Sequence, residues 1–274
     1  MNELALFAGS GGGILGGHLL GWRTVAAVEI EDYPRRVLLQ RQADGLLPRF
    51  PIWDDICTFD GKPWRGKVDV ISGGFPCQDI SAAGKGDGLD GERSGLWTQM
   101  ARVVSEVRPP FVFVENSPML TTRGGTRVIA DLTQMGYDTK WTVMGAADIG
   151  APHQRDRFWI VAYARSFRGK AGIADSQGWQ EGNPTVLINS SADLANPTHS
   201  GHVWREWELG FAQQEHHSGG SQTDGSRQWW SVEPPVGRVA HGVAHRVDRL
   251  KAIGNGQVPL CAATAFRLLK ERLK

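Results

Sequence analysis

Cys77 is the side chain in this sequence whose surroundings most favour chemistry. It follows Gly73-Gly74-Phe75-Pro76, directly after the apolar run 68–72. A cysteine is most often a small buried apolar residue, which is our interpretation of Cys57 and Cys261. The neighbours of Cys77 are turn formers, so its thiol is expected at an exposed strand end, where it could act as a nucleophile. The segment 83–93 that follows has four glycines and is expected to close over a substrate.

A carboxyl group is expected beside this thiol. Glu115-Asn116 comes at the end of the next apolar run, 111–115. The carboxyl ends of parallel strands meet at one edge of a sheet, so Glu115 and Cys77 would face the same crevice. A glutamate at a strand end is often only solvated, and its position relative to Cys77 is what favours a role. Together the two residues suit covalent catalysis on an electron-poor ring.

A glycine-rich turn provides a third candidate. Residues 7–13, Phe-Ala-Gly-Ser-Gly-Gly-Gly, lie between an expected strand and an expected helix. Glycines let the backbone approach a ligand closely, and a helix N-terminus offers amides to it. Glu29 comes about 18 residues later, a spacing typical of an acid that binds ribose hydroxyls. Such a turn can be purely structural, but the acid favours a nucleotide-like ligand.

These residues require a scaffold that alternates strands with helices. Short apolar runs predict buried strands at 3–8, 24–30, 68–72 and 111–115. Helical spacing occupies the intervals, at 14–20, 33–42, 96–107 and 126–135. This alternation predicts an α/β fold with a mostly parallel sheet covered on both faces. The runs 140–144 and 158–164 predict a terminal strand pair, and 258–273 predicts a further helix.

Composition excludes several classes. Lys and Arg number 30 against 29 Asp and Glu, and 41% of the 274 residues are hydrophobic, which is ordinary for a globular protein. No apolar run reaches the roughly 18 residues of a membrane span, and the first residues lack a basic secretory start. Three cysteines cannot form a disulfide framework. We therefore expect a cytoplasmic protein that is not inserted in a membrane, and the net charge of +1 indicates no particular class of partner.

The motifs, in their order along the chain, resemble those of the DNA (cytosine-5)-methyltransferases of bacterial or phage type. The matching segments are residues 7–13, Gly74-Phe75-Pro76-Cys77-Gln78, Glu115-Asn116, His153-Gln154-Arg155-Asp156-Arg157 and Gly254-Asn255-Gly256-Gln257-Val258-Pro259. The resemblance implies a Rossmann-like fold that binds S-adenosylmethionine. The implied cofactor contacts are Phe7, Gly9, Ser10, Gly11, Gly12, Glu29, Ile30, Asp55, Ile56, Pro76, Leu96 and Asn255.

The resemblance also implies the reaction. Cys77 would add to C6 of a cytosine that has left the duplex stack, and C5 would receive the methyl group. Glu115 would act at ring N3, and Arg155 would hold O2 as an electrostatic clamp. Solvent is expected to take the C5 proton. The implied catalytic set also contains Pro76, Asn116 and Arg157.

The resemblance implies a division of the chain. Residues 1–165 and 237–274 would form the catalytic and cofactor-binding domain, and 166–236 a small, loop-rich target-recognition region. His216-His217 has no companion cysteines at zinc spacing, so no metal is expected. We expect a monomer that binds duplex DNA, with a cognate restriction endonuclease as a candidate partner. Candidate DNA contacts are Gln78, Ser81, Lys85, Arg93, Arg227, Arg238, Arg246 and Arg249.

Departures from the family pattern and four alternatives remain. Ala5 stands where the family usually has Asp, His153 where it has Gln, and Ser117 where it has Val. Ala5 and Ser117 are expected to weaken support of the cofactor loop. The alternatives are an RNA cytosine methyltransferase acting on transfer RNA, a DNA amino-methyltransferase, a NAD-dependent oxidoreductase and a catalytically silent DNA-binding protein. The last three leave Cys77, or the set of Cys77, Glu115 and Arg155, without a role.

Overall fold

A mostly parallel β-sheet forms the centre of the protein. The computed structural model describes residues 1–76, 95–167 and 246–273. Within these ranges one seven-stranded sheet has the order β3-β2-β1-β4-β5-β7-β6. The strands are β1 (Asn2–Leu6), β2 (Arg23–Val28), β3 (Ile52–Trp53), β4 (Val70–Gly73), β5 (Phe111–Asn116), β6 (Tyr137–Met144) and β7 (Arg157–Ala164). β1 to β5 pair in parallel, while β7 runs antiparallel to both β5 and β6. The expected α/β fold and the terminal strand pair are confirmed.

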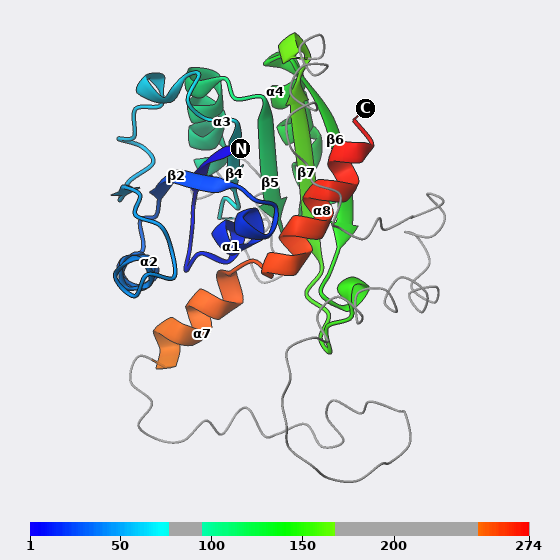
Figure 1. Cartoon of the computed structure of the whole chain (residues 1–274). Coiled ribbons are helices and arrows are strands. Elements are labelled where there is room, and N and C mark those ends of the chain that lie inside the picture. Colours follow the sequence, from blue (N-terminus) through cyan, green and yellow to red (C-terminus); the bar gives the residue numbers. More distant parts are fainter. Residues whose placement is uncertain (77–94, 168–245, 274) are drawn as a thin grey trace, which may run out of the picture.

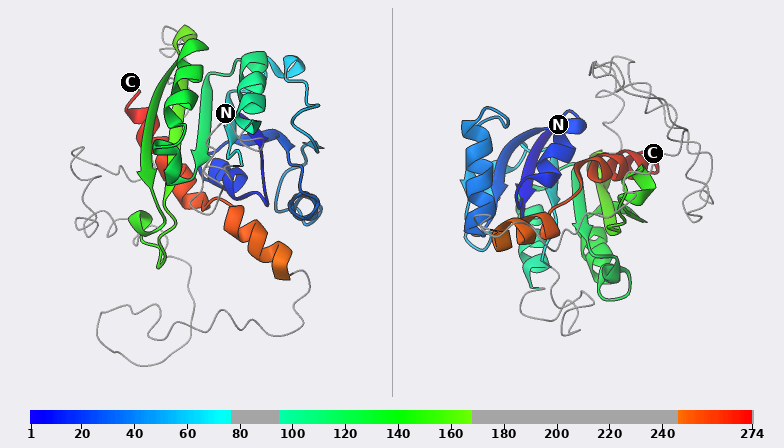
Figure 2. Two further views of the ribbon diagram at one scale, coloured as in Figure 1. Left: turned by 180° about the vertical axis from the view of Figure 1, so that it is seen from behind. Right: turned by 90° about the horizontal axis from the view of Figure 1, so that it is seen from below.

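Helices cover both faces of this sheet (Figures 1 and 2). They are α1 (Gly12–Leu19), α2 (Asp32–Ala43), α3 (Leu96–Val107), α4 (Gly125–Gln134), α7 (Arg246–Asn255) and α8 (Pro259–Glu271). Short 3₁₀ turns occupy Lys62–Trp64, Pro118–Thr121, Ala147–Ile149 and Arg165–Phe167. None of the helices in the described ranges is long and apolar enough to cross a bilayer.

Alternate residues of β4 and β5 are buried in separate hydrophobic clusters on the two faces of the sheet. Ile71 and Val112 pack with α3 and α4, whereas Val70 and Phe113 pack with α8. This is the period-two pattern of a sheet buried on both faces. α3 buries Trp97, Met100, Val103, Val104 and Val107, an amphipathic spacing that explains why its predicted bounds are confirmed. Several tryptophans therefore serve the core, as Trp22, Trp97 and Trp159 do.

The sequence-based prediction missed two elements. β3 has only two residues, too few to give a periodic signal. α7 exposes its large apolar residues, Val247, Leu250 and Ile253, so it lacks the buried stripe that marks a helix. Most of the predicted target-recognition region lies outside the described residues, so the domain division stays a prediction. The two ends of the predicted catalytic domain do pack together, since α8 lies against α1.

Glu3 is a carboxyl group inside the sheet. Its side chain is fully buried; Oε2 accepts a hydrogen bond from Thr24 Oγ1 of β2 at 2.7 Å, and Oε1 one from Ser72 Oγ of β4 at 2.6 Å. Burial raises the pKa of Glu3 from 4.5 to about 7, against the opposing effect of both hydrogen bonds. β1 is therefore tied to both neighbouring strands by an acid that is neutral below neutral pH.

This carboxyl group makes stability depend on pH. Because the pKa of Glu3 rises from 4.5 in the unfolded chain to about 7 in the folded chain, the folded chain binds more protons between these two pH values. The stability it contributes is therefore complete at low pH and is lost as the pH rises through about 7. From about pH 4 to about pH 8, the unfolding free energy is expected to fall by about 3 kcal/mol more in the wild type than in Glu3→Gln. Urea unfolding at a series of pH values measures this, and parallel curves for the two proteins would contradict it.

Candidate active site

The glycine-rich turn after β1 lies at the carboxyl edge of the sheet (Figure 1). Phe7, Gly9 and Gly11 have positive φ angles of 51°, 54° and 92°. A Cβ disfavours this region, which explains glycine at two of these three positions. α1 then begins at Gly12 without a side-chain cap. The first amides of a helix have no intrahelical acceptor, so they can bind a polar ligand.

Glu29 joins this turn to the end of β2. Its Oε2 accepts a hydrogen bond from Gly9 N at 2.6 Å, and its Oε1 accepts one from Glu31 N at 2.8 Å. Its own backbone N–H donates to Trp53 O at 2.9 Å, which fixes the end of β3 beside it. Burial raises the pKa of Glu29, and the two amide hydrogen bonds oppose that shift. The structure thus places Glu29 between the glycine turn and β3, as its predicted role requires.

Four other predicted cofactor contacts lie near the same strand ends. Ile30 is 65% exposed and follows β2, while Ile56 is buried in the turn that follows β3. Asp55 accepts a hydrogen bond from Cys57 N at 2.8 Å, which shapes that turn. Leu96 is the first residue of α3 and packs against the same core as Ile56. β2, β3 and α3 therefore bring these residues to one end of the sheet, although the chain separates them widely.

Glu115, the second-last residue of β5, is a buried carboxyl group with a cationic partner. It is 8% exposed, and its Oε1 lies 2.8 Å from Arg157 Nε. Gln257 Nε2 lies 3.5 Å from Oε2 on the other side. Burial raises the pKa of Glu115 to about 7, while Arg157 and Arg155 oppose that shift. A carboxyl group with such a pKa can hold or release a proton near neutral pH.

Asn116 connects this carboxyl group with the strand end that leads to Cys77. Its Nδ2 donates to Phe75 O at 3.1 Å, and its Oδ1 accepts from Ser117 N at 2.7 Å. Pro76 is the last described residue of that segment. The segment that leads to Cys77 is therefore anchored at Phe75 to the residue after Glu115.

Arg155 has a different environment from the one expected. It has a positive φ of 79°, and its Nη2 donates to Ile253 O and Gly254 O, each at 2.8 Å, and also to Gly256 O. The guanidinium group thus binds carbonyl groups at and beyond the C-terminus of α7. The arginine that contacts Glu115 is Arg157, the first residue of β7. The clamp on O2 that we predicted for Arg155 stays a prediction, and Arg157 is a second candidate for it because it contacts Glu115.

Gln257 is a site residue that the sequence did not single out individually. Cβ atoms added at Gly12 and Gly13 would collide with its backbone and side chain, and one added at Gly74 would collide with Glu115. Glycines at these positions let the glycine turn, the end of β4 and the segment before α8 approach closely. The only signal was the position of Gln257 inside the Gly254-Asn255 motif. Asn255 itself ends α7.

Comparison with known proteins identifies the family of the chain. The family model for the C-5 cytosine-specific DNA methylase matches residues 1–227. The chain belongs to this family. Every motif of the sequence analysis up to Arg157 lies inside that match, and the Gly-Asn motif lies beyond it.

Two relatives show the degree of similarity within the DNA methylase family. The type II methyltransferase M.CviJI of Paramecium bursaria Chlorella virus IL3A is 31% identical over 195 residues, which are 69% of this chain and 51% of that protein. The type II methyltransferase M2.BsuMI of Bacillus subtilis is 30% identical over 203 residues, 70% of this chain and 50% of that protein. The chain thus spans about half the length of the curated relatives it matches. The solved structure of Entamoeba histolytica methyltransferase EhMeth has a similar fold, with a TM-score of 0.50 at 15% identity over 61% of this chain and 54% of that chain.

Several predicted site residues lie outside the described part of the chain. They are Cys77, Gln78, Ser81, Lys85, Arg93, Arg227 and Arg238. Arg246 is the first residue of α7. Their roles stay predictions. In the described ranges, no group of three or more His, Cys, Asp or Glu residues could hold a metal ion.

Ala5, which stands where the family usually has Asp, is buried among Ile14, Ala27 and Leu38. The turn obtains its carboxylate contact from Glu29 instead.

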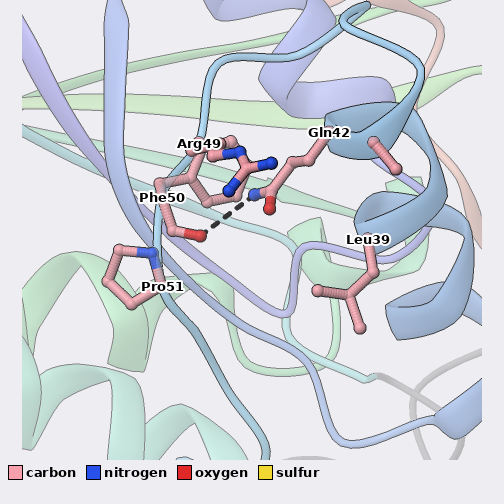
Figure 3. A pocket seen from close by; sticks show the side chains of 6 residues that line it. Leu39, Gln42, Arg49, Phe50 and Pro51 are labelled. Carbon is pink, nitrogen blue, oxygen red and sulfur yellow. Dashed lines mark hydrogen bonds between the residues drawn. The ribbon is translucent and has the colours of Figure 1, made fainter.

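A separate hollow between α2 and the chain before β3 is lined by Leu39, Gln42, Ala43, Arg49, Phe50 and Pro51 (Figure 3). Gln42 Nε2 donates to Phe50 O there at 3.0 Å. None of the predicted site residues lines that hollow.

Proposed function

We propose that this protein methylates C5 of a cytosine in a specific duplex DNA sequence. The methyl donor is S-adenosylmethionine, and Cys77 is the nucleophile. The observation that carries the proposal is the ion pair of the buried Glu115 with the partly exposed Arg157, 2.8 Å apart, while the neighbouring Asn116 binds Phe75 O in the segment that leads to Cys77. A carboxyl group that can carry a proton, with a cation beside it, suits a ring that is attacked and protonated in turn.

The residues at the carboxyl edge fit the cofactor. Ser10 Oγ is buried and has no hydrogen-bond partner within the described part of the chain, as expected for a group that awaits a ligand. Glu29 has carboxylate oxygens at the end of β2 that can accept ribose hydroxyls. The amides at the start of α1 complete a polar cradle. S-adenosylmethionine supplies an electrophilic methyl group when it is bound.

The chain's own residues then act on the base. The cytosine leaves the stack, because face-on attack is blocked inside a duplex. The Cys77 thiolate forms a bond to C6, and the electron pair of the C5–C6 double bond moves toward C5. Glu115 holds a proton at N3, and Arg157 stabilises the charge that develops at O2. After C5 is methylated, its proton passes to solvent and the C6–sulfur bond breaks, which restores the ring and the thiolate.

A substrate comparison tests the proposal. The full chain is incubated with radiolabelled S-adenosylmethionine and either plasmid DNA or transfer RNA, and the labelled nucleoside is identified. We expect 5-methylcytosine in the DNA and no label in the RNA, and bisulfite sequencing of the plasmid then gives the target sequence. Label confined to transfer RNA would favour the RNA enzyme, and N4-methylcytosine would favour an amino-methyltransferase.

We further propose that the protein is a monomer that acts in the cytoplasm, and that a cognate restriction endonuclease acts on the same DNA sequence.

A further inference from the structure

Arg102 of α3 binds the turn that follows β3. Its Nη2 donates to Ile56 O at 2.6 Å and its Nη1 to Phe59 O at 3.0 Å. The same group contacts Glu106 Oε1 at 2.8 Å, and its Nε donates to Gln99 Oε1 at 2.9 Å. One guanidinium group thus joins two carbonyls of the turn to two side chains one helical turn away on α3. A planar fork of donors suits this task, which a lysine cannot reproduce.

Glu106 makes a third connection to the same segment. Its Oε2 accepts a hydrogen bond from Gly61 N at 2.8 Å, while its Oε1 contacts Arg102. Within the turn, Thr58 N donates to Asp55 O at 3.1 Å. Residues 55–61 are therefore held to α3 at Ile56, Phe59 and Gly61. The position of this turn therefore depends on two charged side chains of α3, Arg102 and Glu106.

This turn carries Asp55 and Ile56, which the family resemblance implies to be contacts of the adenine of the cofactor. Asp55 and Ile56 follow β3, whose end is fixed on β2 by the hydrogen bond from Glu29 N to Trp53 O. One end of the turn is thus set by the strand that carries Glu29, and the other by Arg102. A turn already held in its binding conformation loses less conformational entropy when a ligand binds.

We propose that Arg102 is a positioning residue for the adenine end of S-adenosylmethionine. It acts through Ile56 O and Phe59 O and does not touch the cofactor. The inference rests on the proposed function, since it requires that Asp55 and Ile56 line the adenine site. Nothing in the family motifs of the sequence points to Arg102.

Arg65 provides a matched control on the same two elements. It also joins this part of the chain to α3 through two backbone carbonyls, with Nε donating to Glu106 O at 2.9 Å and Nη2 to Ser105 O at 3.2 Å. Its bonds lie beyond Gly61, away from Asp55 and Ile56. Arg65→Lys removes a comparable fork without releasing the turn, so it reports the purely structural cost.

The test compares Arg102→Lys, Arg102→Met, Arg65→Lys and the wild type as full chains. Calorimetry gives the dissociation constant for S-adenosylhomocysteine, and initial rates give kcat and the KM for S-adenosylmethionine. Loss of the two carbonyl hydrogen bonds is expected to raise the dissociation constant about tenfold in both Arg102 variants. The KM should rise with it, while kcat and the Arg65→Lys constants stay within about twofold.

The outcomes separate this inference from the proposed function. Unchanged affinity in Arg102→Lys, or an equal loss in Arg65→Lys, would overturn the positioning role while leaving the methyltransferase intact. A wild-type protein that binds no S-adenosylhomocysteine would overturn the proposed function itself. If Arg102→Met does not fold, the Arg102→Lys and Arg65→Lys pair still decides, because both keep the cation and lose the fork.

Discussion

Replacing Cys77 with serine is expected to abolish methyl transfer while S-adenosylhomocysteine still binds within about twofold of the wild type. A free cysteine thiol has a pKa of about 8.5, so a fraction of it is thiolate at neutral pH, whereas a serine hydroxyl is not ionised there. The cofactor-binding groups that the structure describes, such as Glu29 and the start of α1, do not depend on the thiol. Radiolabel transfer to plasmid DNA measures the first effect, and calorimetry measures the second.

A chemical trap makes the Cys77 prediction specific. DNA that carries 5-fluorocytosine at the target has no proton to lose from C5, so the C6–sulfur bond should persist. The wild type is expected to form a covalent complex that survives denaturing electrophoresis, and Cys77→Ser is expected to form none. Full activity in Cys77→Ser, or an active wild type that cannot be trapped, would contradict the covalent mechanism.

Replacing Arg157 with methionine is expected to lower kcat about 10³-fold, the size of effect seen when a preorganised electrostatic group is removed from an active site. The change leaves Glu115 buried without its cation at 2.8 Å, and the developing charge on the base without its clamp. Because Arg157 opposes the upward shift, its removal should raise the pKa of Glu115 above about 7. The alkaline limb of the kcat–pH profile should therefore move to higher pH, which steady-state rates across the pH range measure.

Arg155→Met is the matched control for that prediction. Arg155 binds the carbonyls of Ile253 and Gly254, so its loss should lower the thermal midpoint of unfolding more than Arg157→Met does. Because Arg155 also opposes the upward pKa shift of Glu115, but less than Arg157 does, the alkaline limb should move in the same direction by a smaller amount. A large loss of kcat in Arg155→Met, with the midpoint unchanged, would return the contact with O2 to Arg155.

Sequence patterns predicted the elements that bury a regular stripe. α3 has the predicted bounds because its apolar residues recur at helical spacing over the whole of Leu96–Val107. α7 gave no such signal because Val247, Leu250 and Ile253 are exposed. β3 is stabilised mainly by its pairing with β2. A strand of two residues has no periodic pattern from which this long-range interaction could be predicted.

Sequence motifs named the candidate site residues, but they could not predict which of the described ones contact each other. Glu115, Arg155 and Arg157 all stood in the sequence as candidates, yet spacing alone does not say which arginine reaches the carboxylate. The choice depends on the backbone at Arg155, whose positive φ is unusual for a residue with a side chain. Gln257 contacts Glu115 across 142 residues of chain, so no local pattern could reveal it.

The packing of α8 on α1 has a consequence for how the protein is made. Arg267 of α8 donates to Leu19 O of α1 across 248 residues of sequence. A ribosome therefore releases the glycine turn and α1 long before it releases the helix that covers them. Contacts of such long range are slow to form, and the early part of the chain must wait with apolar surface uncovered. Packing of the glycine turn and α1 is thus completed only after α8 has been synthesised. In a nascent chain that lacks α8, we expect the proposed binding site for the methyl donor to be incompletely folded.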